Sequence, residues 1–312
     1  MKRFATLLTV AVLAAFQLYA QDMESATQRY NEGAQALNEG NKEVALACFE
    51  DALSQAYFIG SEADELAFNC QKNIPIVIIA IAKDCINASD TEKAIAILSD
   101  GIKKAEEYGQ ASAEADMTSL LTQVYTTEGN KYLNAKDYAK AIESYRQTVE
   151  LNPSDGNAWF RIGQAASRLE DEQMTVEALE KASELGQKAN AGKELATFYL
   201  KRANKALNSK DYASAIADAE KSASILASAA AYQIGGRAAF NNKDYAKAIE
   251  SLETYISKSS GKNVNQELYF LAISYETLGN KDKACGYYRQ LMDVPQFKEY
   301  ATHKVNVELK CQ

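Results

Sequence analysis

The stretch Asn134-Ala-Lys-Asp-Tyr-Ala-Lys-Ala-Ile142 decides the fold, because it recurs almost unchanged along the chain. It returns as Asn208-Ser-Lys-Asp-Tyr-Ala-Ser-Ala-Ile216 and as Asn241-Asn-Lys-Asp-Tyr-Ala-Lys-Ala-Ile249, and looser copies occur elsewhere. Such recurrence, with a base period of about 34 residues, indicates a repeat architecture. The position that Ala141 occupies in this phrase identifies seven repeats. We call the residue at this position the repeat marker, and in chain order the markers are Ala45, Ala94, Ala141, Thr175, Ala215, Ala248 and Ala284.

A second small residue stands twelve positions before each of these repeat markers. Small side chains at both places let two helices approach closely. The acidic residue of the phrase (Asp137, Asp211 or Asp244) is expected to cap the helix that follows. Each repeat is therefore predicted to be a pair of helices joined by a short polar turn. The small residues are Gly33, Ala82, Gly129, Gly163, Ala203, Gly236 and Ala272.

These positions resemble the tetratricopeptide repeat (TPR), a helix-turn-helix unit that stacks into a right-handed solenoid. The best pair of units carries the family's aromatic, small and proline residues in order: Tyr125, Gly129, Tyr132, Ala141, Tyr145, Pro153, Trp159 and Gly163. The resemblance implies an all-α, right-handed α-solenoid of about seven TPR units, here a single elongated domain over 21–298 with a C-terminal cap at 299–312. The units are expected near 26–59, 75–108, 122–155, 156–189, 196–229, 229–262 and 265–298.

Two spacings between repeats exceed the base period, and the extra sequence lies at Ser61–Ile74 and Gln110–Ser119. Both segments are compatible with helix, so the simplest interpretation lengthens the first helices of the second and third repeats, with a kink at Pro75. The alternative is a separate connecting helix with a break near Pro75, because proline donates no backbone hydrogen bond.

The first twenty residues read as a secretory signal peptide, with Lys2 and Arg3 before an apolar run and a cleavage site after Ala20. An uncleaved anchor is the alternative, but the run is about 16 residues, shorter than the roughly 20 that a spanning helix needs. Cleavage leaves 32 basic and 42 acidic residues, a formal charge of −10. We therefore expect an exported protein, in the periplasm or on the extracellular face of the envelope. Nucleic acid is an unfavourable partner, and stable membrane insertion is not expected.

In the TPR family the first helix of each unit lines a concave groove, and the resemblance implies contacts at fixed places of that helix. One place falls on Asn130, Gln164, Asn204 and Arg237, and another, four residues later, on Asn134, Arg168, Asn208 and Asn241. Amides that donate and accept hydrogen bonds could hold an extended peptide, and arginines could grip a carboxylate. For Asn134, Asn208 and Asn241 the alternative is a purely structural role at the helix end, where asparagine tolerates left-handed backbone geometry.

An earlier place on the same helices is occupied by Thr126, Phe160, Leu200 and Gln233. The family's carboxylate clamp for chaperone tails needs a lysine there, so this clamp is incomplete. Gln233 joins the predicted binding set, and Phe160 and Phe240 could offer an apolar floor to the groove. The alternative for these two aromatic residues is packing between repeats.

The five cysteines could form disulfides in an exported chain, although the odd number leaves at least one free. Folding the first repeat back on the second about Gly60 brings Cys48 near Cys70, which makes them plausible partners. The alternative is that the cysteines are buried free thiols. Metal-ligand spacings are absent from the sequence and His303 is the only histidine, so neither a metal nor another cofactor is expected.

Together these features predict a non-enzymatic protein–protein interaction scaffold of the bacterial cell envelope, with a peptide or protein segment in the concave groove. Glycine-rich phosphate loops and nucleophile motifs are absent from the sequence. Two alternatives stay open. The 18 tyrosines could bind a glycan or another small ligand, and the chain could be a structural envelope protein that self-associates.

Overall fold

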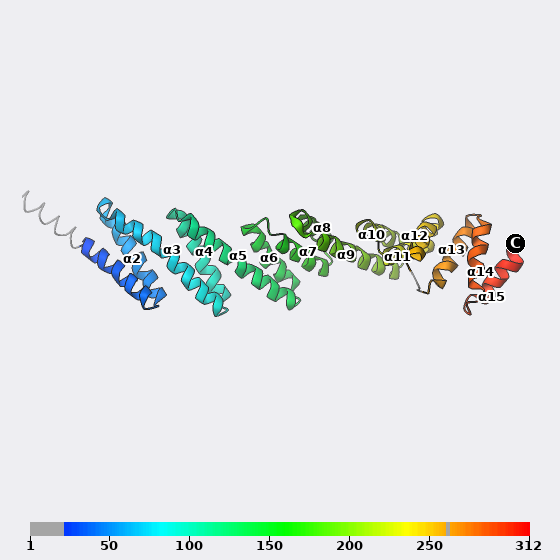
Figure 1. The fold of residues 1–312 in the computed structure, drawn as a ribbon, viewed down its shortest axis with the longest axis horizontal. Helices are drawn as coiled ribbons and strands as arrows, with labels where there is room; N and C mark the ends of the chain where they lie inside the picture. Colours follow the sequence, from blue (N-terminus) through cyan, green and yellow to red (C-terminus); the bar gives the residue numbers. More distant parts are fainter. Residues whose placement is uncertain (1–21, 260–262) are drawn as a thin grey trace, which may run out of the picture. The chain divides into compact units, whose positions relative to one another are not determined.

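The computed structural model describes residues 22–259 and 263–312, and within these ranges every regular element is helical (Figure 1). The predicted all-α fold class is thereby confirmed. The predicted signal peptide at residues 1–20 lies outside the described residues.

The chain divides into two compact units, of which the first is Met1–Pro153. In its described part, residues 22–38 are helical, and five further helices follow: α2 (Lys42–Ile59), α3 (Asp64–Asn87), α4 (Thr91–Glu107), α5 (Ala111–Asn134) and α6 (Tyr138–Leu151). From α2 to α6 each helix packs against the next, and α3 also contacts α5. This nearest-neighbour packing is the arrangement of an α-solenoid.

The second unit is Ser154–Gln312 and repeats the same scheme. Successive helices again pack in order, and the first helices of neighbouring pairs touch, as α7 with α9 and α9 with α11. The sequence predicts one continuous domain, whereas the structure divides into two units. Its helices are α7 (Gly156–Arg168), α8 (Glu172–Ala182), α9 (Lys188–Asn208), α10 (Tyr212–Ile225), α11 (Ala229–Asn241), α12 (Tyr245–Lys258), α13 (Asn265–Thr277), α14 (Lys281–Leu291) and α15 (Lys298–His303).

Small residues hold the paired helices close together, as predicted. All seven repeat markers are completely buried, with 0% exposure from Ala45 to Ala284. A Cβ atom on Gly163 would lie 2.5 Å from Leu179 Cγ, and one on Gly236 would lie 2.6 Å from the same atom of Leu252. These separations are shorter than any non-bonded carbon contact, so glycine is what permits this helix approach.

The turn between paired helices has the same geometry throughout, with a left-handed residue five positions before the repeat marker. In the third repeat this residue is Lys136, with φ of 61°. Its N–H donates to the carbonyl of Leu133 (3.1 Å), and the N–H of Asp137 donates to that of Tyr132 (2.9 Å), which is a Schellman motif. The seven left-handed residues are Gly40, Ser89, Lys136, Glu170, Lys210, Lys243 and Gly279.

The sequence analysis associated left-handed geometry with Asn134, Asn208 and Asn241, and this interpretation is wrong. Each of the three is the last residue of its helix, α5, α9 or α11, and the lysine two residues later takes the left-handed conformation. The reason is that the Schellman closure needs positive φ at the residue beyond the helix cap, which lies one step further along than the asparagines.

The predicted helix caps are confirmed. The carboxylate of Asp137 accepts a hydrogen bond from the backbone N–H of Lys140 (3.3 Å). In the same way, the carboxylate of Asp211 accepts from the N–H of Ser214 (3.2 Å), and the carboxylate of Asp244 accepts from the N–H of Lys247 (3.2 Å). Each carboxylate thus satisfies one of the unpaired N–H groups at the start of a second helix and complements the helix dipole.

The two elongated first helices are confirmed as well. Helices α3 and α5 have 24 residues each. Pro75 lies inside α3 with buried neighbours at Ile74 and Val77, so the alternative with a break near Pro75 is wrong. Packing of α2 and α4 against α3 holds it as one helix despite the hydrogen bond that proline cannot donate. A third long helix, α9 with 21 residues, was not predicted.

By length and composition, one helical stretch of the described residues, Ser61–Asn87, could cross a membrane. Half of its most apolar window is buried within the protein. Its apolar residues Ile74, Val77 and Ile78 belong to the hydrophobic core of the first unit. The burial favours a core helix, because the same side chains cannot face both the protein interior and lipid.

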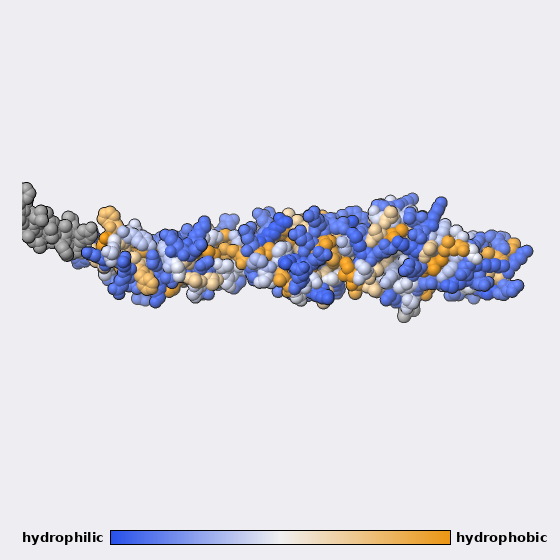
Figure 2. Space-filling model, turned by 90° about the horizontal axis from the view of Figure 1, so that it is seen from above, coloured by the Kyte–Doolittle hydropathy of each residue, from blue (hydrophilic) through white to orange (hydrophobic). Residues whose placement is uncertain are grey.

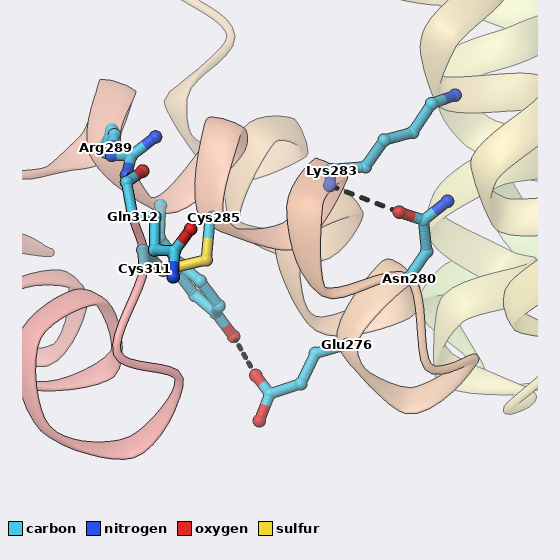
Figure 3. The surroundings of a disulfide bond; sticks show 8 residues. Glu276, Asn280, Lys283, Cys285, Arg289, Cys311 and Gln312 are labelled. Carbon is cyan, nitrogen blue, oxygen red and sulfur yellow. Dashed lines mark hydrogen bonds between the residues drawn. A yellow bond between two sulfur atoms is a disulfide. The ribbon is translucent and has the colours of Figure 1, made fainter.

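The disulfide lies at the C-terminal end, where Cys285 of α14 is bonded to Cys311 (Figure 3). Cys48, Cys70 and Cys85 are free and buried. The predicted pairing of Cys48 with Cys70 is therefore wrong, and the alternative of buried free thiols holds for these three. Burial raises the pKa of Cys70 to about 11, so its thiol is uncharged and unreactive at neutral pH. The sequence analysis paired cysteines across one turn and did not consider a tail that folds back.

The tail that carries Cys311 packs on the last helix pair. Ala301 and Val305 are buried in the same cluster as Leu271 and Leu291. Lys304 lies between two carboxylates, at 2.8 Å from Glu276 and 2.6 Å from Glu308. The tail thus covers apolar surface that a terminal repeat would otherwise expose.

Candidate interaction surface on the first helices

The predicted binding residues lie on the first helices α5, α7, α9 and α11, and the structure gives them different surroundings. On α5, Asn130 is exposed, but its Oδ1 accepts a hydrogen bond from the buried Tyr145 hydroxyl at 2.8 Å. One turn later, Asn134 is exposed, with no side-chain hydrogen bond to any described residue. Asn130 therefore already has a structural role within its repeat.

On α7, both predicted residues have partners in the same unit. Gln164 Oε1 accepts a hydrogen bond from Arg161 at 2.8 Å. Arg168 forms an ion pair with Glu194 of α9, with 3.2 Å between nitrogen and oxygen. The guanidinium therefore links two neighbouring first helices, and a carboxylate ligand would have to compete with Glu194.

On α11, Gln233 and Arg237 both bind the same carboxylate. Glu267 of α13 is 1% exposed, and its Oε1 accepts from Gln233 (2.9 Å) and from Arg237 Nε (2.8 Å). Gln233 also donates to the hydroxyl of Tyr255, and Asn241 donates to the Arg237 carbonyl at 2.8 Å. This network joins successive repeats, because a buried carboxylate must be paired and hydrogen-bonded.

The two aromatic residues of the predicted groove floor are half-buried in packing between repeats. Phe240 stacks on Phe270 of α13, with 4.2 Å between ring centres. Phe160 packs against the cluster of Leu179, Ala182 and Ala191. Their placement agrees with the alternative role in inter-repeat packing.

Helix α9 presents the most accessible pair of predicted residues. Asn204 and Asn208 are both exposed and lie one turn apart on the same face. Among the described residues neither amide has a side-chain hydrogen bond. Both amides are therefore available to donate to and accept from a ligand.

Beside these asparagines, Arg202 of α9 joins two acidic residues of neighbouring helices. It pairs with Glu172 and also lies 3.2 Å from Asp218. The hydrogen bond from Arg202 lowers the pKa of Glu172, whereas burial raises the pKa of Asp218. Burial likewise raises the pKa of Tyr199, over whose ring Lys221 lies at 4.8 Å. These groups are mutually satisfied and fix α9 between α8 and α10.

The structure also contains a surface hollow that the sequence analysis missed. It has a volume of about 580 Å³ and lies in the first unit, between the end of α3, the start of α4 and the middle of α5. Lys83 and Ile86 contribute from α3, and Leu120, Gln123 and Lys131 from α5. The signal was present, because Lys83 and Asn87 stand one turn apart on a first helix. The binding positions that the family resemblance implied, however, were assigned only in the later repeats, from Thr126 onward.

On the face shown in Figure 2, hydrophobic patches alternate with hydrophilic ones over both units. Among the large apolar side chains of the described residues, Phe58 is the most exposed, at 87%. Within the described ranges, groups of histidine, cysteine or acidic side chains that could hold a metal ion do not occur.

Comparisons with known proteins agree with the repeat pattern. Residues 126–189 and residues 267–296 each match a family model described as tetratricopeptide repeat. No curated protein sequence matches the chain.

Among solved structures, a crystal structure of MamA is 20% identical, covering 57% of this chain and 94% of its own, with a TM-score of 0.36. A tetratricopeptide repeat protein from Parabacteroides merdae is 13% identical. The match covers 93% of this chain and 100% of that protein, with a TM-score of 0.27. PilW, described as a type IV pilus biogenesis factor, is 17% identical. The match covers 73% of this chain and 97% of PilW, with a TM-score of 0.31.

The recurring turn, the buried small residues and the ordered packing define a helical-repeat protein of the α-solenoid class. Two separate stretches of the chain, residues 126–189 and 267–296, are thus tetratricopeptide repeats by their match to the models of that family. Proteins of this family generally bind protein partners and are typically not enzymes, and this chain is accordingly a protein-interaction scaffold.

Proposed function

We propose that this scaffold is exported to the bacterial cell envelope, is not an enzyme, and binds a peptide or protein segment along its first helices. The observation that carries the proposal is the pair Asn204 and Asn208, two exposed amides on one face of α9. Amides at such a spacing can hold the backbone of an extended peptide without regard to its side chains.

Two features support the location. The apolar run within residues 1–20 is preceded by Lys2 and Arg3, as in secretory signal peptides. The Cys285–Cys311 disulfide supports an oxidising compartment, because such bonds rarely persist in a reducing cytosol.

The surroundings of His303 support a non-enzymatic role. Its Nε2 lies 3.3 Å from Glu308 in the C-terminal tail, and its helix α15 packs against α14, which is a second helix of its pair. It is the one imidazole of the chain, and imidazole is the side chain best suited to proton transfer at neutral pH.

The test is a crosslinking pull-down from cell-envelope extract with the protein and with the double variant Asn204→Ala, Asn208→Ala. Arg237→Ala and Asn130→Ala are unsuitable here, because both side chains have structural partners. The matched control replaces two exposed amides on second helices, Gln173→Ala with Gln290→Ala.

We expect a partner that the protein and the control capture and that the α9 double variant loses. Capture by all three forms would mean that α9 is not the binding surface. If crosslinking yields only the protein itself, with sedimentation that depends on concentration, the self-association alternative replaces this proposal.

A further inference from the structure

The C-terminal tail, residues 298–312, covers the last helix pair with few buried side chains of its own. Ala301 is completely buried and Val305 is 5% exposed, whereas the other residues of the tail are exposed or half-buried. Two small apolar side chains remove little surface from water, and ordering each residue of the tail costs conformational entropy. The apolar contacts of the tail therefore hold it only weakly.

The polar contacts of the tail lie where water reaches them. Lys304 pairs with Glu276 of α13 at 2.8 Å, and the Glu276 side chain is 26% exposed. Arg289 of α14 donates to the exposed backbone carbonyl of Gln312. Ion pairs and hydrogen bonds at such places contribute little to stability, because water competes for the same groups.

The disulfide is thus the contact that keeps the tail in place. It joins Cys285 of α14 to Cys311 near the end of the tail (Figure 3). The three other cysteines, Cys48, Cys70 and Cys85, are free thiols. Within the described residues, a reductant therefore changes this one bond and leaves the rest of the covalent structure as it is.

The face beneath the tail is apolar and carries one carboxylate. Leu271 of α13 and Leu291 of α14 have no exposed surface and share a cluster with the two buried side chains of the tail. Beside them, Glu276 accepts a hydrogen bond from the Tyr288 hydroxyl at 2.6 Å and pairs with Lys304. If the tail leaves, leucine side chains meet water and Glu276 loses its cation. Such a face favours an apolar partner with a positive charge.

The tail itself shows what shape of partner fits this face. It is helical over α15 and over a further helical segment, Lys304–Glu308. Its contacts Phe297, Ala301 and Val305 stand four residues apart, and Phe297 stacks on Tyr269 of α13 with 5.0 Å between ring centres. Residues at this spacing lie along one side of a helix. The face is therefore complementary to a helix with one apolar side.

We propose that the tail is a redox-controlled cover over a second binding face of this scaffold. While the bond between Cys285 and Cys311 is intact, the tail occupies the face. After reduction the tail leaves, and α13 and α14 bind an amphipathic helix of a protein partner in its place. That helix carries aliphatic side chains at four-residue intervals and a lysine that pairs with Glu276. The inference adds to the proposed scaffold function a place of contact that does not involve α9.

The release is a thiol–disulfide exchange with a protein dithiol as the reductant. One thiolate of the reductant attacks the sulfur of Cys311, because Cys311 is half-buried whereas Cys285 is 4% exposed. The bond between the two sulfurs breaks, and Cys285 leaves with the electron pair and takes up a proton. The second thiol of the reductant then attacks the mixed disulfide, and Cys311 leaves in the same way. The protein gains two electrons and two protons, and the reductant becomes a disulfide.

The test is fluorescence anisotropy with a labelled peptide of residues 296–312 that carries Cys311→Ser. A control peptide carries Ala301→Glu and Val305→Glu in addition. Four forms of the full chain are compared: the oxidised protein, the protein reduced with dithiothreitol, the variant Cys285→Ser with Cys311→Ser, and an open variant. The open variant combines Ala301→Glu, Val305→Glu and Cys311→Ser, so that its own tail cannot return to the face. Circular dichroism compares the helix content of all four.

We expect the peptide to bind the reduced protein and the double serine variant at least about tenfold more tightly than the oxidised protein, because affinity scales with the fraction of open molecules. The open variant should bind most tightly, since no tail competes. Dithiothreitol should not change binding to the double serine variant. The control peptide should bind at least about tenfold more weakly, because it would bury two charges.

Equal binding to the oxidised and the reduced protein would overturn the proposal, because the disulfide would not control access to the face. Absence of binding to an open variant with unchanged helix content would overturn it as well, because the face would not accept a helix. If the open variant loses helix content, the reduced natural chain decides, and absence of binding there overturns the proposal. In each case, capture that depends on Asn204 and Asn208 in the pull-down would leave the proposed function standing.

Discussion

Single residues set how closely the helices of this protein approach. Gly236 lies against Leu252, where a Cβ would be 2.6 Å from the leucine side chain and 3.2 Å from its backbone nitrogen. Gly286 on α14 is also helical but has nothing within 4 Å of such an atom. The same amino acid is therefore required for packing at one position and only lowers helix stability at the other.

Alanine substitution should separate these two roles. Gly236→Ala should lower the free energy of unfolding by about 1–3 kcal/mol through overpacking. Gly286→Ala should raise it by about 0.5–1 kcal/mol, because alanine loses less backbone entropy in a helix. Urea unfolding followed by circular dichroism measures both. Equal effects of the two substitutions would contradict the close approach at Leu252.

The buried carboxylate of Glu267 makes Arg237 a structural residue. Arg237→Ala should cost about 3 kcal/mol, because it leaves a buried charge without its main partner. Adding Glu267→Gln should restore at least half of the loss, since the amide still bonds Gln233 and carries no charge. Thermal unfolding of the single and double variants tests this coupling. Strict additivity of the two substitutions would argue against it.

At the scale of elements, the turn and the terminal tail show how local chemistry ends and covers helices. The Schellman closure at Lys136 and the cap by Asp137 follow each other within two residues, so one helix ends as the next begins. The tail is held differently, by a covalent bond to α14 and by Lys304 between two carboxylates.

Removal of the disulfide should loosen the tail. The bond closes a loop over a sequence separation of 26 residues, and its loss should cost about 3–4 kcal/mol by loop entropy. Cys285→Ala with Cys311→Ala, or reduction by dithiothreitol, should speed proteolysis after Lys298 and Lys304. The double variant is its own control, because dithiothreitol should then have no further effect. A non-reduced digest without a peptide pair that links Cys285 to Cys311 would contradict this pairing.

Alkaline pH should destabilise the pair α13 and α14. Burial raises the pKa of Tyr275, Tyr287 and Tyr288 above the value of about 10 that tyrosine has in an unfolded chain. The unfolded state therefore releases these protons first, and stability that is present below about pH 10 is lost as the pH rises further.

The measurement for this prediction is tyrosine absorbance and far-ultraviolet circular dichroism between pH 9 and pH 12. Ionisation of the buried tyrosines should coincide with loss of helix. In Tyr287→Phe with Tyr288→Phe, which cannot ionise at these positions, the loss should move to higher pH. Complete ionisation near pH 10 with unchanged helix content would show that these side chains are accessible.

At the scale of the whole molecule, a repeat protein is held by contacts between neighbours, so each of the two units has its own core. The candidate surfaces are distributed in the same way. The hollow with Lys83 and Lys131 lies in the first unit, and Asn204 and Asn208 lie in the second.

Export makes a further prediction for the intact chain. The protein isolated from the envelope of expressing bacteria should begin at Gln21, since the apolar run ends before a cleavage site after Ala20. Intact-mass spectrometry of that fraction measures this, and Ala20→Arg should block processing. A full-length protein found in the reducing cytosol with all cysteines as thiols would contradict the proposed location.

Much of this fold could be predicted from the sequence because it depends on local and periodic chemistry. The repeated phrase around Asp137 predicted the turns and caps, and the buried alanines and glycines predicted which faces meet. The long helices α3 and α5 followed from the extra residues between repeats. All of these depend on residues within one period of each other, where the repeat itself supplies the geometry.

Only the tertiary structure decided which polar residues are used internally and which face outward. Arg237 and Asn204 occupy corresponding first-helix positions of the pattern, yet Arg237 is paired with the buried Glu267 whereas Asn204 is exposed. The bond between Cys285 and Cys311 and the hollow between α3 and α5 likewise depend on which segments fold against each other. Periodicity fixes the direction of a side chain on its own helix, but its partners come from neighbouring helices, whose register is set by packing.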